Sequence, residues 1–168
     1  FGLFGLRFTK RPNYEKTLEK GELYPELAYL LCLISEPTAN DTFLDPFSGS
    51  GSIPITRMLG FPFKAVYASD NDKKLIEKIK AKVRKIRGNF VMGNWNALQL
   101  TNFSKGSIDK IVTDPPWGLH SGKELNLERF YEDMLKEFSR LLRKDGVLVL
   151  LTAQKELMEA LLNKFTNE

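Results

Sequence analysis

The sequence predicts a single α/β domain with a doubly wound parallel sheet. Apolar strand-like runs alternate with helical segments from about residue 42 to residue 165, and this alternation is typical of parallel strands joined by right-handed helical crossovers. No internal repeat or low-complexity stretch interrupts it. At 168 residues the chain is long enough for one well-buried domain and short for two. We therefore expect helices on both faces of one sheet.

The chain divides into an N-terminal extension or linker remnant, residues 1–20, and a globular domain, residues 21–168. Residues 23–34 are apolar almost all round, and Pro25 is acceptable in the first turn of a helix, so we expect a buried helix at about 23–35. Strands and helices then alternate. The expected strands are 42–45, 64–69, 90–92, 108–113 and 146–151, and the expected helices are 51–59, 72–87, 127–142 and 154–165.

The composition is that of an ordinary soluble globular protein, with 42% hydrophobic and 27% charged residues. No apolar run approaches the roughly 18 to 20 residues that a membrane span needs, and no signal peptide is recognisable. The single cysteine, Cys32, lies in an apolar run and excludes an internal disulfide. These features favour a reducing compartment, and we expect a cytoplasmic protein. The first residue, Phe1, is not methionine, which indicates a piece of a longer protein.

Positive charge is concentrated in one segment, although the net charge of the chain is only +4. Residues 73–87 contain eight Lys or Arg and one acid, Glu77. This segment could bind phosphates. The more ordinary interpretation is the solvated side of an amphipathic helix. The residues expected to face inward in that case are Leu75, Ile76, Ile79, Val83 and Ile86.

The stretch Asp114-Pro115-Pro116-Trp117 follows an expected strand and is a poor candidate for ordinary secondary structure. The prolines donate no backbone N–H and bias the preceding residue to extended geometry, so the chain leaves the strand stiff, with unused carbonyls. Asp114 and the Pro115 carbonyl offer acceptors, and Trp117 offers a flat face. This combination predicts a clamp for a planar group that carries an amine. The alternative is a strand end and a tight turn, with Trp117 in the core.

A second motif, residues 45–52, joins the first strand to its helix. Its glycines allow a sharp turn and a close approach to a ligand, and the first N–H groups of the following helix point into the same space. Asp70 closes the second strand, where an acid can accept hydrogen bonds from both ribose hydroxyls. A dinucleotide fingerprint would need glycine at Pro54, and a negative charge at Asp45 would repel a pyrophosphate. A nucleoside with a positive end, such as S-adenosylmethionine, fits better; a ligand-free turn is the alternative.

The end of the third strand is the expected place for the adenine ring of such a ligand. Residues 93–100 follow that strand, and an amide oxygen there can accept a hydrogen bond from the adenine amine. Asn96 is the first candidate and Asn94 the second, but either side chain could instead cap a turn. Trp95 is expected in the core.

With these motifs in order, the chain resembles the class I S-adenosylmethionine-dependent methyltransferases that methylate amines through an Asp/Asn-Pro-Pro-aromatic motif. More narrowly, it is similar to the catalytic domain of the RNA guanine-N2 methyltransferases that carry an RNA-binding THUMP domain upstream. The resemblance spans about residues 10–155. The matching segments are Arg11-Pro12, Leu23-Tyr24-Pro25-Glu26-Leu27-Ala28, Phe43-Leu44-Asp45-Pro46 with Gly49-Ser50-Gly51, and Ile111-Val112-Thr113-Asp114-Pro115-Pro116-Trp117-Gly118.

The resemblance implies a Rossmann-like sheet with strand order 3-2-1-4-5 and residues 21–168 as a methyltransferase catalytic domain. An antiparallel hairpin normally follows the last helix of this fold and is apparently missing here, since the chain stops at Glu168. Either the hairpin lies beyond this sequence or the fold is trimmed. Asn96 stands where the family usually has aspartate, and Trp117 replaces the commoner Tyr or Phe. The residues expected to bind S-adenosylmethionine are Asp45, Pro46, Phe47, Ser48, Gly49, Ser50, Gly51, Asp70, Asn71, Asn96, Ala97 and Asp114.

The expected reaction is methylation of an exocyclic amine of a nucleobase in RNA, and the resemblance favours guanine N2 in tRNA or rRNA. The base would leave its stack, lie against Trp117 and place its amine between Asp114 and the Pro115 carbonyl. The expected catalytic residues are therefore Asp114, Pro115, Pro116 and Trp117. We expect no metal ion, and an upstream RNA-binding domain outside this chain. The residues expected to bind the RNA are Arg11, Trp117, His120 and Lys123.

Two other functions stay open at this point. A DNA amino-methyltransferase is the nearer one, because the same clamp suits the amines of adenine and cytosine. A methyltransferase fold without activity, kept as an RNA-binding or partner-activating module, is the other. Both motifs are intact, which argues against the inactive module. His120 lies in a polar loop, where a solvated histidine with no function is the ordinary case.

Overall fold

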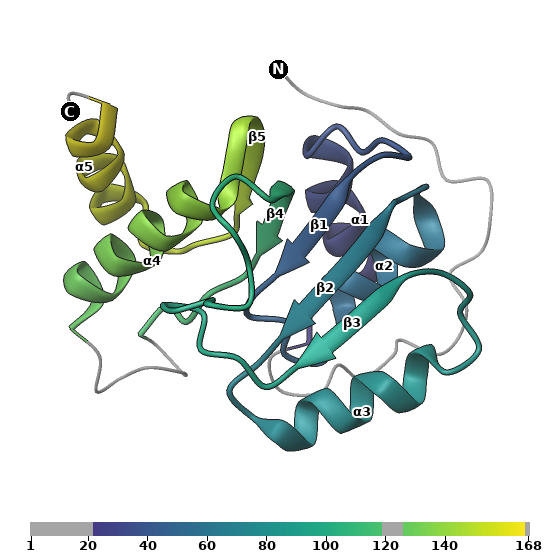
Figure 1. The fold of residues 1–168 in the computed structure, drawn as a ribbon. Helices are drawn as coiled ribbons and strands as arrows, with labels where there is room; N and C mark the ends of the chain where they lie inside the picture. The colour runs from purple at the N-terminus through teal and green to yellow at the C-terminus, as the bar shows by residue number, and fades with distance from the viewer. Residues whose placement is uncertain (1–21, 119–125, 167–168) are drawn as a thin grey trace, which may run out of the picture.

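A computed structural model describes residues 22–118 and 126–166. The described part has a five-stranded parallel sheet with the order β3-β2-β1-β4-β5 (Figure 1), which confirms the predicted fold class and strand order. The strands are β1 Thr42–Asp45, β2 Ala65–Ser69, β3 Phe90–Gly93, β4 Ile108–Thr113 and β5 Leu142–Leu150. The helices are α1 Pro25–Ile34, α2 Ser52–Gly60, α3 Lys73–Val83, α4 Leu127–Leu141 and α5 Lys155–Thr166.

Each face of the sheet has its own hydrophobic core, because successive strand residues point to opposite faces. In β1, Phe43 packs with α1, α2 and α3, whereas Leu44 packs with α4 and α5. Figure 1 shows α4 and α5 on one side of the sheet and α1 and α2 on the other. Every residue of β4, which lies between β1 and β5, is buried. Parallel sheets are normally covered on both faces in this way.

The first helix is less buried than its apolar sequence predicts. Ala28, Leu31 and Cys32 are buried, but Leu30 and Leu33 are each 49% exposed. The prediction of a helix buried all round is wrong because α1 lies in the outer layer, where α2 covers one face of it (Figure 1). Apolar as α1 is, no helix within the described ranges is long and apolar enough to cross a membrane.

Two element boundaries differ from the prediction. The helix expected at 72–87 ends at Val83, and the strand expected to begin at Gly146 begins at Leu142, directly after α4. The polar start of β5 is held against β4 by an ion pair of 2.6 Å between Arg143 and Asp109. A contact between residues this far apart in sequence leaves no mark on the local hydrophobic pattern.

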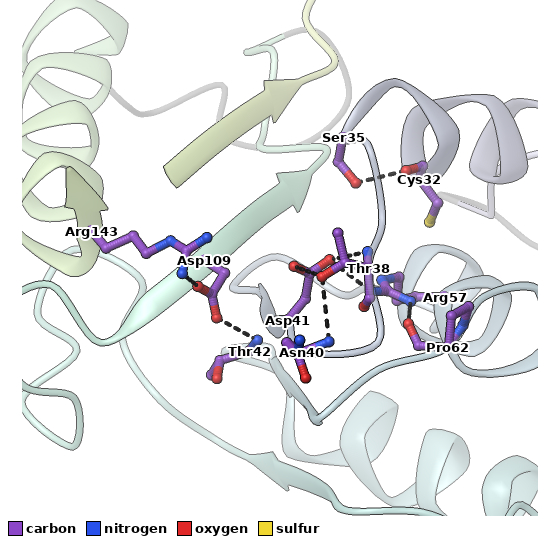
Figure 2. A network of polar contacts seen from close by, with 10 residues as sticks. All are labelled: Cys32, Ser35, Thr38, Asn40, Asp41, Thr42, Arg57, Pro62, Asp109 and Arg143. Carbon is purple, nitrogen blue, oxygen red and sulfur yellow. Dashed lines mark hydrogen bonds and ion pairs between the residues drawn. The ribbon is translucent and has the colours of Figure 1, made fainter. Parts of the chain in front are cut away.

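A buried polar network fixes the start of β1 and the far end of α2 (Figure 2). The Arg57 side chain has no exposed surface and donates to Oδ2 of Asp41 at 3.0 Å and to the Pro62 carbonyl at 2.6 Å. Asp41 also accepts from the backbone N–H and the hydroxyl of Thr38, at 2.7 and 2.8 Å. These contacts anchor the amino-terminal edge of the sheet, opposite the edge where the predicted site residues lie.

Candidate active site

The two sequence motifs meet at the carboxyl edge of neighbouring strands. β1 ends in Asp45, β4 ends in Thr113, and the two strands pair in parallel. The Thr113 hydroxyl donates a hydrogen bond of 2.7 Å to Oδ1 of Asp45. The glycine loop and the Asp114-Pro115-Pro116-Trp117 stretch therefore leave the sheet side by side, as a shared site requires.

Asp45 is a buried acid with one unused oxygen. Its side chain has no exposed surface, and Oδ2 has no hydrogen-bond partner among the described residues. Burial raises the pKa of Asp45 to about 8, opposed by the hydrogen bonds from Thr113 and from the Phe47 N–H, while the charge of Asp114 raises it further. Burial therefore makes the negative charge of this carboxylate unfavourable when no cation lies beside it. A cation bound at Oδ2 would stabilise the carboxylate, so this residue fits the positive end of S-adenosylmethionine.

The glycine loop turns through conformations that other residues rarely adopt. Gly49 has φ +50° and Gly51 has φ +89°, both in the left-handed region. A Cβ at Gly51 would lie 2.9 Å from Cγ1 of Ile79 on α3, so the loop also needs glycine for close packing. The hydroxyl and N–H of Ser48 both donate to the Ser69 carbonyl, at 2.9 and 2.8 Å, and hold the loop to the end of β2.

Asp70 lies beside this loop, as its predicted role with the ribose requires. Its Oδ2 accepts from the Gly49 N–H at 2.9 Å, and its Oδ1 accepts from the Asp72 N–H at 2.8 Å. A carboxylate oxygen can accept a second hydrogen bond, so both oxygens keep capacity for hydroxyl donors. The Asn94 amide donates to the Asp70 carbonyl at 2.6 Å and so links the ends of β2 and β3. Asn71, next in the chain, is exposed.

The predicted adenine residues lie just after β3. The side-chain oxygen of Asn96 accepts from the Leu98 N–H at 3.0 Å. Asn96 therefore caps a turn, which was the alternative to adenine binding. Its second lone pair could still accept from an amine. Ala97 is buried, and Trp95 packs edge-on against Phe103, with ring centroids 5.4 Å apart, in agreement with its expected place in the core.

The predicted clamp has two unused acceptors. Oδ1 of Asp114 is buried without a hydrogen-bond partner, and the Pro115 carbonyl has no donor in the described part of the chain. Burial raises the pKa of Asp114 to about 6, and the neighbouring Trp117 side chain opposes this rise. The Trp117 ring is half-buried, and its N–H donates to the Leu151 carbonyl at 3.3 Å. This bond fixes the edge of the ring.

Residues that the sequence did not single out hold this clamp in place. The Tyr131 hydroxyl on α4 donates to the Pro116 carbonyl at 3.0 Å and lies 3.2 Å from the hydroxyl of Thr152. The Gln154 amide donates to the Trp117 carbonyl at 2.7 Å. Thr113 could have been suspected because it precedes the motif directly. Nothing in the local sequence around Tyr131 or Gln154 indicates such a contact.

Three predicted RNA-binding residues, Arg11, His120 and Lys123, lie outside the described residues, so their roles stay predictions. A cavity of about 320 Å³ adjoins the end of the glycine loop at Ser52, although none of the individually predicted cofactor, catalytic or RNA-binding residues lines it. Its lining comes from the start of α1, the exposed side of α2 and one lysine of α3. The lining residues are Glu22, Leu23, Pro25, Ser52, Ile55, Thr56, Leu59 and Lys82.

The comparisons with known proteins agree with this arrangement. Residues 12–168 match the model of the RMKL-like methyltransferase domain. The chain is 30% identical, over 92% of its length, to a tRNA (guanine(6)-N2)-methyltransferase of Thermus thermophilus, of which it spans 48%. It is also 30% identical, over 80% of its length, to a probable tRNA (guanine(10)-N2)-dimethyltransferase of Methanothermococcus thermolithotrophicus, of which it spans 86%.

Among solved structures, the crystal structure of TrmN from Thermus thermophilus is similar, with a TM-score of 0.70 and 31% sequence identity. The match covers 84% of this chain and 42% of that one. The chain thus spans about half the length of the Thermus proteins that it matches.

Proposed function

The chain belongs to the RMKL-like methyltransferase domain family, and from this premise we propose that it transfers a methyl group from S-adenosylmethionine to the N2 amine of a guanine in tRNA. The observation that carries the proposal is the contact between Thr113 and Asp45, because it brings the cofactor loop and the amine clamp to one edge of the sheet. The choice of guanine N2 and of tRNA is supported by the names of the relatives.

The residues at the end of β1 and β2 suit the cofactor. Asp45 offers its unused Oδ2 to the positive end, and Asp70 offers both oxygens to the ribose hydroxyls. Gly49 and Gly51 allow the loop between Asp45 and α2 to turn through the left-handed region. S-adenosylmethionine supplies a methyl group on a positively charged sulfur, which an amine nitrogen can attack directly. This family uses that cofactor, in agreement with the predicted one.

The residues at the end of β4 suit the base. Oδ1 of Asp114 and the Pro115 carbonyl accept hydrogen bonds from the two N–H groups of the guanine amine, and this turns the nitrogen lone pair toward the methyl group. The Trp117 ring stacks on the base. Holding the two reactants in this orientation can lower the activation free energy by about 7 to 11 kcal/mol. Asp114 acts as an acceptor. As the amine nitrogen gains the methyl group, the sulfur would leave as the neutral thioether of S-adenosylhomocysteine, and the cationic amine would release its proton to water.

Methyl transfer to purified nucleic acids tests the proposal directly. The full-length protein is incubated with labelled S-adenosylmethionine and unmodified tRNA, rRNA or DNA, and the nucleosides are then identified by mass spectrometry. N2-methylguanosine from tRNA is the expected product. Methyladenine or methylcytosine from DNA would identify a DNA methyltransferase instead. Absence of cofactor binding at millimolar concentration in calorimetry would identify a module without catalytic activity.

A further inference from the structure

One strongly basic surface of the protein has no role in the proposed chemistry. It runs along α3 and the turn after it, and we call it the α3 basic face. The opposite side of the helix is buried through Ile76, Ile79 and Val83. Most of the charged side chains therefore point to solvent, whereas Lys82 donates to the Ser50 carbonyl at 3.1 Å. The α3 basic face consists of Lys73, Lys74, Lys78, Lys80, Lys82, Arg84, Lys85 and Arg87.

Most of these charges are not neutralised by the protein itself. Lys80 pairs with Glu77 at 2.9 Å, and Lys82 lies 4.0 Å from Glu22. Five members of the face have no ion pair within the part of the chain that the structure describes. These five are Lys73, Lys74, Arg84, Lys85 and Arg87.

The amphipathic helix α4 shows how the same protein treats a merely solvated face. It carries three bases and four acids, and its charges pair along the helix. Arg129 lies 3.8 Å from Asp133, and Arg140 lies 2.7 Å from Glu137. The α3 segment differs, because its eight bases have only one acid among them to pair with. Simple solvation of a helix does not account for it.

Part of the charge arrangement works against the helix. After the Asp72 N-cap, the first turn of α3 has no acid and begins with Lys73 and Lys74, where the helix dipole disfavours positive charge; Lys80 and Lys82 in the last turn suit the dipole. Lys74, Lys78 and Lys82 are spaced four residues apart, so like charges face each other along one side. An anionic partner would relieve the repulsion between these lysines, so the arrangement favours such a partner.

The α3 basic face begins at the edge of the sheet that carries the candidate active site. α3 starts three residues after Asp70, whose carboxylate accepts from the glycine loop and whose carbonyl accepts from Asn94. The helix has 11 residues, which corresponds to a length of about 16 Å. Figure 1 shows it running along the sheet on the side of β3, the edge strand, with nothing in the described chain outside it. A strand of nucleic acid that leaves the site can follow it over several phosphates.

We propose that the α3 basic face binds the phosphodiester backbone of the RNA whose base enters the active site. This inference rests on the proposed function, because it names a further contact surface for the same substrate. Each Lys or Arg that contacts a phosphate releases condensed counterions, so binding through this face depends strongly on salt. The contacts are independent of base sequence and position the RNA, while the clamp selects the amine.

Paired charge-removing variants of the full-length protein test the proposal. Lys73→Gln/Lys74→Gln removes two charges near the site, and Lys85→Gln/Arg87→Gln removes two at the other end of the face. The control Lys105→Gln/Lys144→Gln removes two exposed lysines near β4 and β5, away from β3. Binding of unmodified tRNA is measured by fluorescence anisotropy over a series of salt concentrations. The rate of methyl transfer is measured over a series of tRNA concentrations, which gives kcat and the KM for RNA.

Each variant of the α3 basic face is expected to weaken RNA binding and raise the KM for RNA by roughly 2- to 30-fold, the range for two exposed ion pairs. The slope of log K for RNA binding against log salt concentration should become less negative by about 1 to 2. The kcat at saturating RNA and the Kd for S-adenosylmethionine should not change, and the control should match the wild type.

The outcomes separate this inference from the proposed function. If the wild type methylates tRNA and the α3 variants match the control, the inference is wrong and the function stands. If the wild type transfers no methyl group but the variants weaken its RNA binding, the proposed function is wrong, and only RNA binding by the α3 basic face stands. All substituted side chains are exposed, so we expect each variant to fold. An unchanged Kd for the cofactor in titration calorimetry checks this for each variant.

Discussion

The Thr113 hydroxyl donates a hydrogen bond of 2.7 Å to Oδ1 of Asp45, and this single contact joins the cofactor loop to the strand that carries the clamp. The two acids of the site are also coupled through their charges, since Asp114 raises the pKa of Asp45. Each acid has one buried oxygen without a partner among the described residues. A cation bound at Oδ2 of Asp45 would satisfy that oxygen and leave Oδ1 of Asp114 free to accept from the substrate amine.

Replacing Asp114 tests its role as an acceptor. Asp114→Ala should lower kcat by roughly 10²- to 10⁴-fold, because the amine loses one of its two orienting acceptors. The Kd for S-adenosylmethionine should stay close to the wild-type value, as measured by calorimetry. Asp145→Ala, which removes an exposed carboxylate of β5, is the matched control. An equal loss of cofactor affinity and turnover in Asp114→Ala would show that the residue holds the cofactor and not the amine.

The pH dependence of the reaction should report the same residue. Burial raises the pKa of Asp114 to about 6, and only the carboxylate accepts a hydrogen bond at both oxygens. The kcat/KM for RNA at saturating cofactor should therefore fall toward tenfold per pH unit below about pH 6 and level off above it. The measurement is initial rates of methyl transfer across this range. A profile that stays flat down to about pH 5 would contradict the assignment.

The buried acid Asp45 should destabilise the protein when no cofactor is bound. Its folded pKa of about 8 lies above the unfolded value of about 3.9. The folded state therefore holds an extra proton between these values, and the free energy of unfolding falls as pH rises through this window. Asp45→Asn cannot ionise, so it should raise the Tm of the cofactor-free protein by at least about 5 °C near pH 9 and change it little near pH 5.

The same variant should bind S-adenosylmethionine more weakly, because an amide oxygen attracts a cation less than a carboxylate does. Scanning calorimetry at both pH values and titration calorimetry with the cofactor measure the two effects. Asp145→Asn, at an exposed position, should change neither. A Tm of Asp45→Asn that falls with pH as steeply as that of the wild type would assign the pH dependence to another group.

The ion pair at the opposite edge should matter for stability alone. Arg57→Met leaves Asp41 buried without its cation and should lower the free energy of unfolding by about 3 to 5 kcal/mol. Lys155→Met removes an ion pair that is 82% and 63% exposed and should cost less than about 1 kcal/mol. Urea unfolding measures both, and the cofactor Kd of the folded Arg57→Met protein should be unchanged. A small loss for Arg57→Met would mean that Thr38 alone satisfies Asp41.

The sequence predicted the parallel sheet and the place of both motifs because these depend on local patterns, and the family resemblance implied the strand order. Alternating strands and helices determine the sheet, and the acids at Asp45 and Asp70 end their strands by sequence alone. The unsatisfied oxygen and raised pKa of Asp45 could not be predicted, since they depend on burial by residues distant in the chain. The same is true of the bonds from Tyr131 and Gln154 to the clamp.

The errors in the prediction have a similar origin. The hydrophobic pattern shows which side chains avoid water, but not what covers them, so the exposed Leu30 and Leu33 of α1 were predicted to be buried. The start of β5 was placed four residues late, at Gly146, because Arg143, Lys144 and Asp145 resemble a polar loop. The ion pair that holds Arg143 against β4 forms only in the folded sheet.

The network around Arg57 has a mechanical consequence for α2. This helix carries the glycine loop at its first residue and is locked to Asp41 and the Pro62 carbonyl near its last turn. The end of α2 distant from the glycine loop is therefore fixed by buried contacts that no predicted site residue makes. Substitutions in the loops at the carboxyl edge of the sheet can change substrate preference without removing these stabilising contacts.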